Sequence, residues 1–290
     1  MGLPRLLVVD GMGGVSPHEY LRSLTPLAEL KVLYVPPPFA DHAAQKEREL
    51  ATRADGIEVV RIERPDQVAD AIMEIARTWS PDGVFAQNEH LLHQVALAAE
   101  QLGLPYHSAH AASLVQRKDL QRAALLAAGV PGPRMAVLTP GVDPAAALAE
   151  VGLPAVLKPI VGVGSISTML IDSESTLAGA VAEADRHYRE DPRMYGREPV
   201  LMLESLLVGQ RWHDDERYGD HASVESLIFD GEVTHLAVTD KYPLAPPFRE
   251  TGDLLPSILD DERQASCATP RPTRSGPSTC GTARRTSSSS

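Results

Sequence analysis

A lysine and a glycine-rich turn lie close together in the segment PAVLKPIVGVGSISTMLI, residues 154–171. Lys158 ends a β-like apolar run, and the turn Gly162–Ser165 follows a few residues later. Glycine has no Cβ and tolerates positive φ, so such a turn lets backbone N–H groups approach phosphate oxygens. Lys158 would add a positive charge at the same place. From this segment alone, an ordinary β-hairpin with a glycine turn and a solvent-reaching lysine is the favoured interpretation, and a phosphate-binding turn is the alternative.

Two familiar phosphate motifs are excluded by the residues that follow these glycines. A P-loop needs G-x-x-x-x-G-K-[ST] at the start of a helix, and no Lys-Ser or Lys-Thr pair follows here. A dinucleotide fingerprint needs three glycines that lead into a helix, whereas Ser167 holds the third slot and residues 168–171 read as a strand. The expected local architecture is therefore strand, glycine flap, strand.

The first part of the chain alternates short apolar runs with helical patterns. Ser16, Pro17 and Glu19 supply an N-cap, a first-turn proline and a capping-box glutamate for the first helix. This alternation over residues 1–107 predicts a parallel, doubly wound sheet in an α/β fold. The expected strands are 6–10, 31–35, 57–60 and 83–86, and the expected later helices are 65–78 and 89–102.

The second part of the chain begins with a predicted helix over residues 113–128, which Gly129 and Pro131 end. It carries Arg117, Lys118 and Arg122, and from the residues alone a solvated charged face is the favoured interpretation. The chain after it is expected to be mostly β with one helix. The expected elements are a helix over 173–190, a strand over 200–207, and a hairpin of 222–229 with 232–239 around an Asp-Gly turn.

Composition places the chain among soluble globular proteins, because 43% of its 290 residues are hydrophobic and 23% are charged. The net charge of -12 argues against a broad nucleic-acid or membrane surface. No apolar run approaches the roughly 20 residues of a membrane span, and the N-terminus reads as a first strand rather than a signal. Cys267 and Cys280 indicate no disulfide framework, so a cytoplasmic location is expected.

The last part of the chain changes character at Arg263. Residues 263–290 contain no Asp or Glu and no apolar side chain larger than alanine and cysteine. Such a segment buries too little surface to offset the entropy of ordering it, so disorder is predicted over 263–290. A natural tail and a reading-frame shift near Arg263 are the two interpretations, and the DNA sequence decides between them.

Several segments in a fixed order resemble the ATP-grasp superfamily of carboxylate–amine ligases, which includes biotin carboxylase and D-alanine–D-alanine ligase. Within it, the chain looks most like the L-amino-acid ligase and carnosine-synthase-like branch. The resemblance covers residues 1 to about 262, and each motif is weak alone. The motifs are Arg117-Lys118-Asp119, Leu157-Lys158-Pro159 with residues 162–167, residues 203–209, residues 223–226, residues 238–241 and residues 250–256.

The resemblance implies a site for ATP and Mg²⁺. Lys118 and Lys158 look like the lysines that hold the nucleotide phosphates, and Lys241 lies where such enzymes often line the acceptor site and is the expected catalytic residue. Asp220-His221 fills the slot of a common ribose-contacting glutamate. The expected nucleotide-binding residues are Lys118, Lys158, Gly162, Gly164 and Ser165 of the flap, and Glu204, Ser205 and Leu207 of the hinge beside adenine.

The resemblance also implies a domain scheme and a reaction. The expected N-terminal Rossmann-like domain covers 1–110, and the ATP-grasp domain covers 111–262, with a lid over 134–206 and a partial C-terminal subdomain over 207–262. The reaction is transfer of a phosphoryl group from ATP to a carboxylate, followed by attack of an amine that forms an amide or peptide bond. The expected partners are a small carboxylate and a small amine, amino acids in this branch, with no nucleic acid and no membrane. The identity of the substrates and the oligomeric state, a homodimer included, stay open.

The chain departs from the family where the metal ligands should lie. The family uses a glutamate and a Glu-x-Asn pair after the region of Pro256, and residues 263–290 contain no Asp, Glu or Asn. The oxygen ligands that Mg²⁺ needs are then missing, so no metal ligand is assigned and an impaired, inactive ligase is predicted. The alternatives are a non-catalytic ATP-binding protein and a dinucleotide-dependent enzyme that uses the loop Gly11–Gly14.

Overall fold

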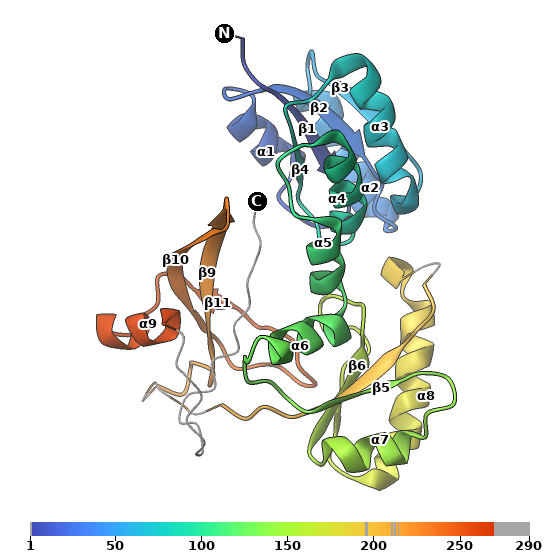
Figure 1. Cartoon of the computed structure of the whole chain (residues 1–290), viewed down its shortest axis with the longest axis vertical. Coiled ribbons are helices and arrows are strands. Elements are labelled where there is room, and N and C mark those ends of the chain that lie inside the picture. Colours follow the sequence, from blue (N-terminus) through green and yellow to red (C-terminus); the bar gives the residue numbers. More distant parts are fainter. Residues whose placement is uncertain (1, 195–196, 210, 212, 214, 270–290) are drawn as a thin grey trace. The chain divides into compact units, whose positions relative to one another are not determined.

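The computed structural model describes residues 2–194, 197–209, 211, 213 and 215–269. It divides into two compact units, one up to Gln121 and one from Arg122 onward (Figure 1). The boundary between the two units lies inside the helix of residues 118–127. Among the described residues, no helix is both long and apolar enough to cross a membrane.

The first unit contains the predicted parallel sheet, with the strand order β3-β2-β1-β4. Successive side chains of a strand point to opposite faces of the sheet, so neighbouring residues of β1 lie in different cores. Leu7 packs with α3 and α4, whereas Val8 packs with α1 and α2. Helices therefore cover both faces of the sheet. The elements are β1 Arg5–Asp10, α1 Pro17–Leu24, β2 Glu29–Tyr34, α2 Ala40–Arg53, β3 Glu58–Arg61, η1 Pro65–Gln67, α3 Val68–Trp79, β4 Gly83–Ala86, α4 Leu92–Leu102 and α5 Ala109–Gln116.

The ends of these helices follow the local sequence closely. The Ser16–Glu19 capping box is present at the start of α1, and Gly103 ends α4 with a φ of 66°. The helix α2 was not expected, because Leu50 is its only buried residue and a single apolar position gives no periodic pattern.

The helix expected over residues 113–128 is wrong as a single element. The structure has two helices there, α5 and then α6 Lys118–Ala127, separated by Arg117 in an extended conformation (φ -111°, ψ 114°). Arg117 donates from Nε and Nη2 to the carboxylate of Asp119 at 3.1 and 2.5 Å. This local ion pair stabilises the break and places Asp119 in the first turn of α6, where a negative charge is favourable.

The second unit begins with a four-stranded antiparallel sheet in the order β5-β8-β6-β7. Two helices, α7 and α8, pack on the face of this sheet that carries Leu157 and Leu203. Only α8 was expected; the alanine-rich α7 starts with an Asp143 N-cap and Pro144, but alanine marks no apolar face in the sequence. The elements are β5 Met135–Leu138, α7 Pro144–Val151, β6 Ala155–Pro159, β7 Met169–Ile171, α8 Glu174–Glu190, η2 Pro192–Met194 and β8 Leu201–Ser205.

A second antiparallel sheet follows, with β10 Glu232–Lys241 between β9 Ala222–Phe229 and β11 Asp253–Leu254. The predicted Asp-Gly turn joins β9 and β10, with positive φ at both turn residues (48° and 79°). Disorder from Arg263 does not hold for residues 263–268, which belong to α9 Asp261–Ala268. Asp260 caps this helix, and Cys267 is buried against Val224 and Val238. The remainder of the expected tail, residues 270–290, lies outside the described residues.

Candidate functional site

The strand pair β6–β8 brings Lys158 and Glu204 to the same face of the sheet. In this antiparallel pair Val156 lies opposite Glu204, and Lys158 lies opposite Met202. Residues two apart share a face, so Lys158 and Glu204 are diagonal neighbours. Their strand neighbours Leu157 and Leu203 point to the other face, into the core with α7 and α8. The alternation that builds the core therefore also places the two charged side chains on the opposite face.

Glu204 holds two cationic side chains at once. Lys158 Nζ donates to Glu204 Oε2, and Arg122 Nε donates to Glu204 Oε1 at 2.9 Å. The Glu204 side chain is 6% exposed and that of Lys158 15% exposed. A carboxylate this buried needs such partners, because an isolated buried charge is strongly unfavourable. The interpretation of Arg122 as part of a solvated face is wrong, since its guanidinium contacts a carboxylate 82 residues away in the sequence.

The glycine-rich flap between β6 and β7 has the backbone geometry that its sequence suggests. Gly164, Ser165 and Ser167 have φ values of 60°, 56° and 48°, in the left-handed region. Gly162 is needed for a different reason, because a Cβ there would lie 2.8 Å from Cγ2 of Ile166. Ser165 Oγ donates to the backbone oxygen of Phe248 at 2.7 Å. Within the described chain, the buried Ser167 Oγ has no hydrogen-bond partner.

The predicted hinge follows Glu204 directly. Ser205 exchanges hydrogen bonds with the backbone of Arg134, donating from N at 2.9 Å and accepting at Oγ at 3.1 Å. Leu206 N donates to the backbone oxygen of Pro154 at 2.9 Å. The next side chain, Leu207, is 61% exposed. The end of β8 is thus held firmly, and the chain leaves the sheet at Leu207.

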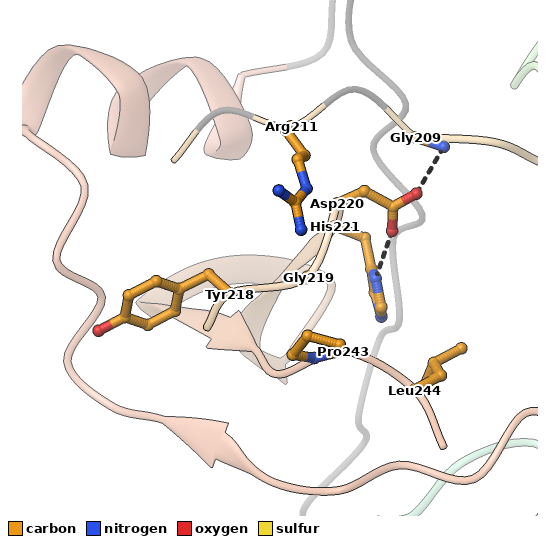
Figure 2. Close-up of a pocket in the computed structure, with 8 residues that line it drawn as sticks. All are labelled: Gly209, Arg211, Tyr218, Gly219, Asp220, His221, Pro243 and Leu244. Carbon is orange, nitrogen blue, oxygen red and sulfur yellow. Dashed lines mark hydrogen bonds and ion pairs between the residues drawn. The ribbon is translucent and has the colours of Figure 1, made fainter. Parts of the chain in front are cut away.

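A cavity of about 390 Å³ lies beyond the hinge (Figure 2). Asp220 is central to its wall: its Oδ2 accepts a hydrogen bond from Gly209 N at 2.9 Å, and its Oδ1 lies 3.2 Å from Nδ1 of His221. Both carboxylate oxygens of Asp220 therefore contact other groups of the protein. Through its bond to Gly209 N, Asp220 stabilises the chain that follows the hinge. The cavity is lined by Gly209, Arg211, Tyr218, Gly219, Asp220, His221, Pro243 and Leu244.

Lys241, the expected catalytic residue, lies at the end of β10. Its Nζ is 2.8 Å from Oδ1 of Asp253 on β11, and its side chain is 11% exposed. The preceding Asp240 is fully buried and accepts hydrogen bonds from Ser257 Oγ at 2.7 Å and Ile258 N at 2.8 Å. Asp240 therefore holds the segment that follows β11 in place. Lys241, the next residue, places a positive charge at the end of β10.

Two further points about the predicted site concern the second phosphate lysine and the metal. Lys118 is the first residue of α6 and belongs to the first unit, so its convergence with Lys158 remains a prediction. For Mg²⁺, no group of three or more His, Cys, Asp or Glu side chains in the described part of the chain is placed to hold a metal ion.

The loop Gly11–Gly14 in the first unit is bordered by contacts within that unit. Val15 N donates to Oε1 of Gln87 at 3.0 Å, and the capping box closes the start of α1. Lys46 Nζ donates to Asp10 Oδ1 at 2.6 Å and to the backbone oxygen of Gly13 at 3.1 Å. Burial raises the pKa of the Asp10 carboxyl despite this lysine. The loop is thus closed by contacts within its own unit.

The combination of a parallel α/β unit with a flap-bearing antiparallel sheet and a second antiparallel sheet is the ATP-grasp architecture. No known family profile matches the chain. The fold, the ordered motifs and the sequence matches place the chain in the ATP-grasp superfamily.

Among curated proteins, the chain is 30% identical over 282 residues to the alanine–anticapsin ligase of Bacillus subtilis, covering 89% of this chain and 59% of that protein. The alanine–anticapsin ligase of Bacillus amyloliquefaciens matches equally, at 30% identity over 282 residues. The chain spans a little over half the length of these relatives.

Solved structures share the fold at lower sequence identity. The L-amino acid ligase of Bacillus licheniformis has a TM-score of 0.65 and 18% identity, covering 91% of this chain and 57% of that one. The biotin carboxylase domain of the Hydrogenobacter thermophilus 2-oxoglutarate carboxylase has a TM-score of 0.64 and 16% identity, covering 90% and 55%. That domain was crystallised with MgADP, ADP and bicarbonate.

Proposed function

We propose that the second unit binds ATP, and that the chain is the nucleotide-binding part of a ligase that joins a carboxylate to an amine. One observation carries the proposal: the buried Glu204 at the end of β8 is bonded to both Lys158 and Arg122. Adenine offers an amino donor for a carboxylate, and phosphates offer negative charge for a lysine. The acidic and basic groups that a nucleotide requires are therefore adjacent on one face of the sheet.

In this proposal each site residue has a defined task. Glu204 accepts a hydrogen bond from the adenine amino group, and the backbone of Ser205 to Leu207 lines the base. Lys158 and the flap neutralise the phosphates. The left-handed backbone at Gly164 and Ser165 and the unpartnered Ser167 Oγ among the described residues support the flap's role.

The reaction proposed is amide-bond formation between two small molecules, with amino acids as the substrate class. A bound ATP supplies the phosphoryl group that gives a carboxylate a leaving group, and an amine then replaces the phosphate. The names of the similar proteins, alanine–anticapsin ligase and L-amino acid ligase, support this class. Lys241 is proposed to act at the acceptor side, where its charge would attract a carboxylate.

A second candidate is ATP binding without turnover, and the shortage of acidic residues that could hold Mg²⁺ favours it. Mg²⁺ is the expected companion of ATP, yet the described residues offer no three-ligand group, and residues 263–290 contain no Asp, Glu or Asn. The described residues do not fit a site for Mg²⁺. For this 290-residue polypeptide by itself we propose ATP binding with impaired ligation.

Calorimetric titration of the purified chain with ATP and with NAD tests the proposal. ATP is expected to bind and NAD is not, because the Gly11–Gly14 loop lacks the third glycine of a dinucleotide fingerprint at the required spacing. Binding of NAD in preference to ATP, or binding of neither, would contradict the proposed function.

A further inference from the structure

Arg122 is the residue of the site that neither the sequence patterns nor the expected phosphate contacts explain. It is 28% exposed on α6, and its Nε lies 2.9 Å from Oε1 of Glu204. Lys158 reaches the other oxygen, Oε2, from β6. The two cations therefore approach Glu204 from different elements and bind different oxygens.

The two cations are not equivalent in what they are able to do. Lys158 has a compact ammonium on a flexible stem, and in the proposed function it serves the phosphates. The Arg122 guanidinium is planar and has its donors in a fixed fork, so it fixes the orientation of a carboxylate better than an ammonium does. A Glu204 that shares Lys158 with a nucleotide still needs a partner, because its side chain is only 6% exposed. Arg122 supplies that partner without taking part in phosphate binding.

We propose that Arg122 is a positioning residue that holds Oε1 of Glu204 and directs Oε2 toward the exocyclic amino group of adenine. The inference rests on the proposed ATP site. The inference adds a specificity for the purine base. An oriented carboxylate accepts a hydrogen bond from the 6-amino group of adenine, and it repels a 6-oxo purine, whose oxygen is also an acceptor. The site then prefers ATP to inosine triphosphate through Arg122.

The test measures dissociation constants for ATP and inosine triphosphate by calorimetry, in the wild-type chain and in Arg122→Met. The wild-type chain is expected to prefer ATP. In Arg122→Met the affinity for ATP falls about tenfold, the loss typical of one charge-assisted hydrogen bond, while that for inosine triphosphate stays nearly constant. A purely structural role of Arg122 would weaken both nucleotides alike and leave their ratio unchanged.

Two further variants complete the design. Arg186→Met removes an arginine from an exposed pair with Glu190 on α8, 2.8 Å apart, and is expected to leave both affinities unchanged. Arg122→Lys keeps the charge but loses the planar fork, so it recovers part of the ATP preference. Arg122→Lys also tests the inference if Arg122→Met fails to fold. A ratio of ATP affinity to inosine triphosphate affinity equal to that of the wild type in Arg122→Lys would overturn the inference.

The outcomes separate the inference from the proposed function. Equal wild-type affinity for ATP and inosine triphosphate leaves an ATP site but overturns the role of Arg122. An unchanged ratio in a folded Arg122→Met overturns it as well. A wild-type chain that binds neither nucleotide removes the proposed function and the inference together.

Discussion

Carboxylates in the second unit differ in the kind of group that holds them, and two of them, Asp240 and Glu204, are buried. Asp240 accepts from Ser257 and from a backbone N–H, and Asp220 accepts from a backbone N–H and lies beside His221. Glu204 is held by two long cationic side chains. Backbone donors cannot leave without unfolding a loop, whereas a lysine is able to exchange partners. This difference supports the proposal that Glu204 is the carboxylate that binds the nucleotide.

A pH-dependent contribution to stability is expected from Asp191, next to the flap. Three nitrogens of Arg193 donate to it, and these hydrogen bonds hold the pKa of Asp191 below its usual 3.8. A lowered folded-state pKa gives stability that is present above the unfolded value and lost as pH falls through the folded value. Asp191→Asn should therefore lower the free energy of unfolding at pH 7 by about 1 kcal/mol, with a smaller effect below pH 3.8.

Urea unfolding of both proteins at several pH values measures this difference. Asp66→Asn is the control, because Asp66 and its partner Arg64 are each 66% exposed and such pairs contribute little. A difference that grows as the pH falls would show that Asp191 does not work through its charged form.

At the scale of elements, the flap depends on Gly162. A methyl group there would lie 2.8 Å from Cγ2 of Ile166 and 3.1 Å from Cγ of Pro159, so the flap has to shift. Gly162→Ala is expected to weaken ATP binding about tenfold or more by displacing the phosphate donors. Calorimetry with ATP measures the loss.

The matched control for the flap is Gly179→Ala in the same unit. Gly179 lies in α8 with nothing within 4 Å of its absent Cβ, and alanine is favoured over glycine in a helix by about 1 kcal/mol. This variant should gain stability and keep its affinity for ATP. Equal ATP affinity in the two variants would show that the flap does not contact the nucleotide.

The sequence predicts those elements that short-range patterns determine. The parallel sheet, the capping box of α1, the flap and the Asp-Gly turn all follow from alternation, caps and backbone preferences of single residues. The break at Arg117 depends on one ion pair with Asp119, and α9 depends on burying Cys267 against β9 and β10. The contact of Arg122 with Glu204 joins residues 82 positions apart, so only the folded sheet reveals it.

At the scale of the whole molecule, each of the two units has its own core, and the second contains the proposed site. The chain spans 59% of the length of the curated ligases it matches. Its residues therefore support ATP binding more directly than they support ligation. With Mg²⁺, ATP and pairs of amino acids, the proposed impairment of ligation predicts no release of phosphate above the rate without enzyme. A colorimetric phosphate assay measures this release, and robust release that depends on both amino acids would refute the impaired state.

The most direct test of the central claim is the affinity of Lys158→Met for ATP, compared with that of Lys31→Met. The two lysines have the same exposed fraction, 15%, and each pairs with a glutamate, but Lys31 lies in the first unit. Loss of a charged contact to phosphate costs about 1.5–3 kcal/mol, so Lys158→Met should bind ATP about 10- to 100-fold more weakly, and Lys31→Met should bind it like the wild type. Unchanged ATP affinity in a folded Lys158→Met protein would contradict the account.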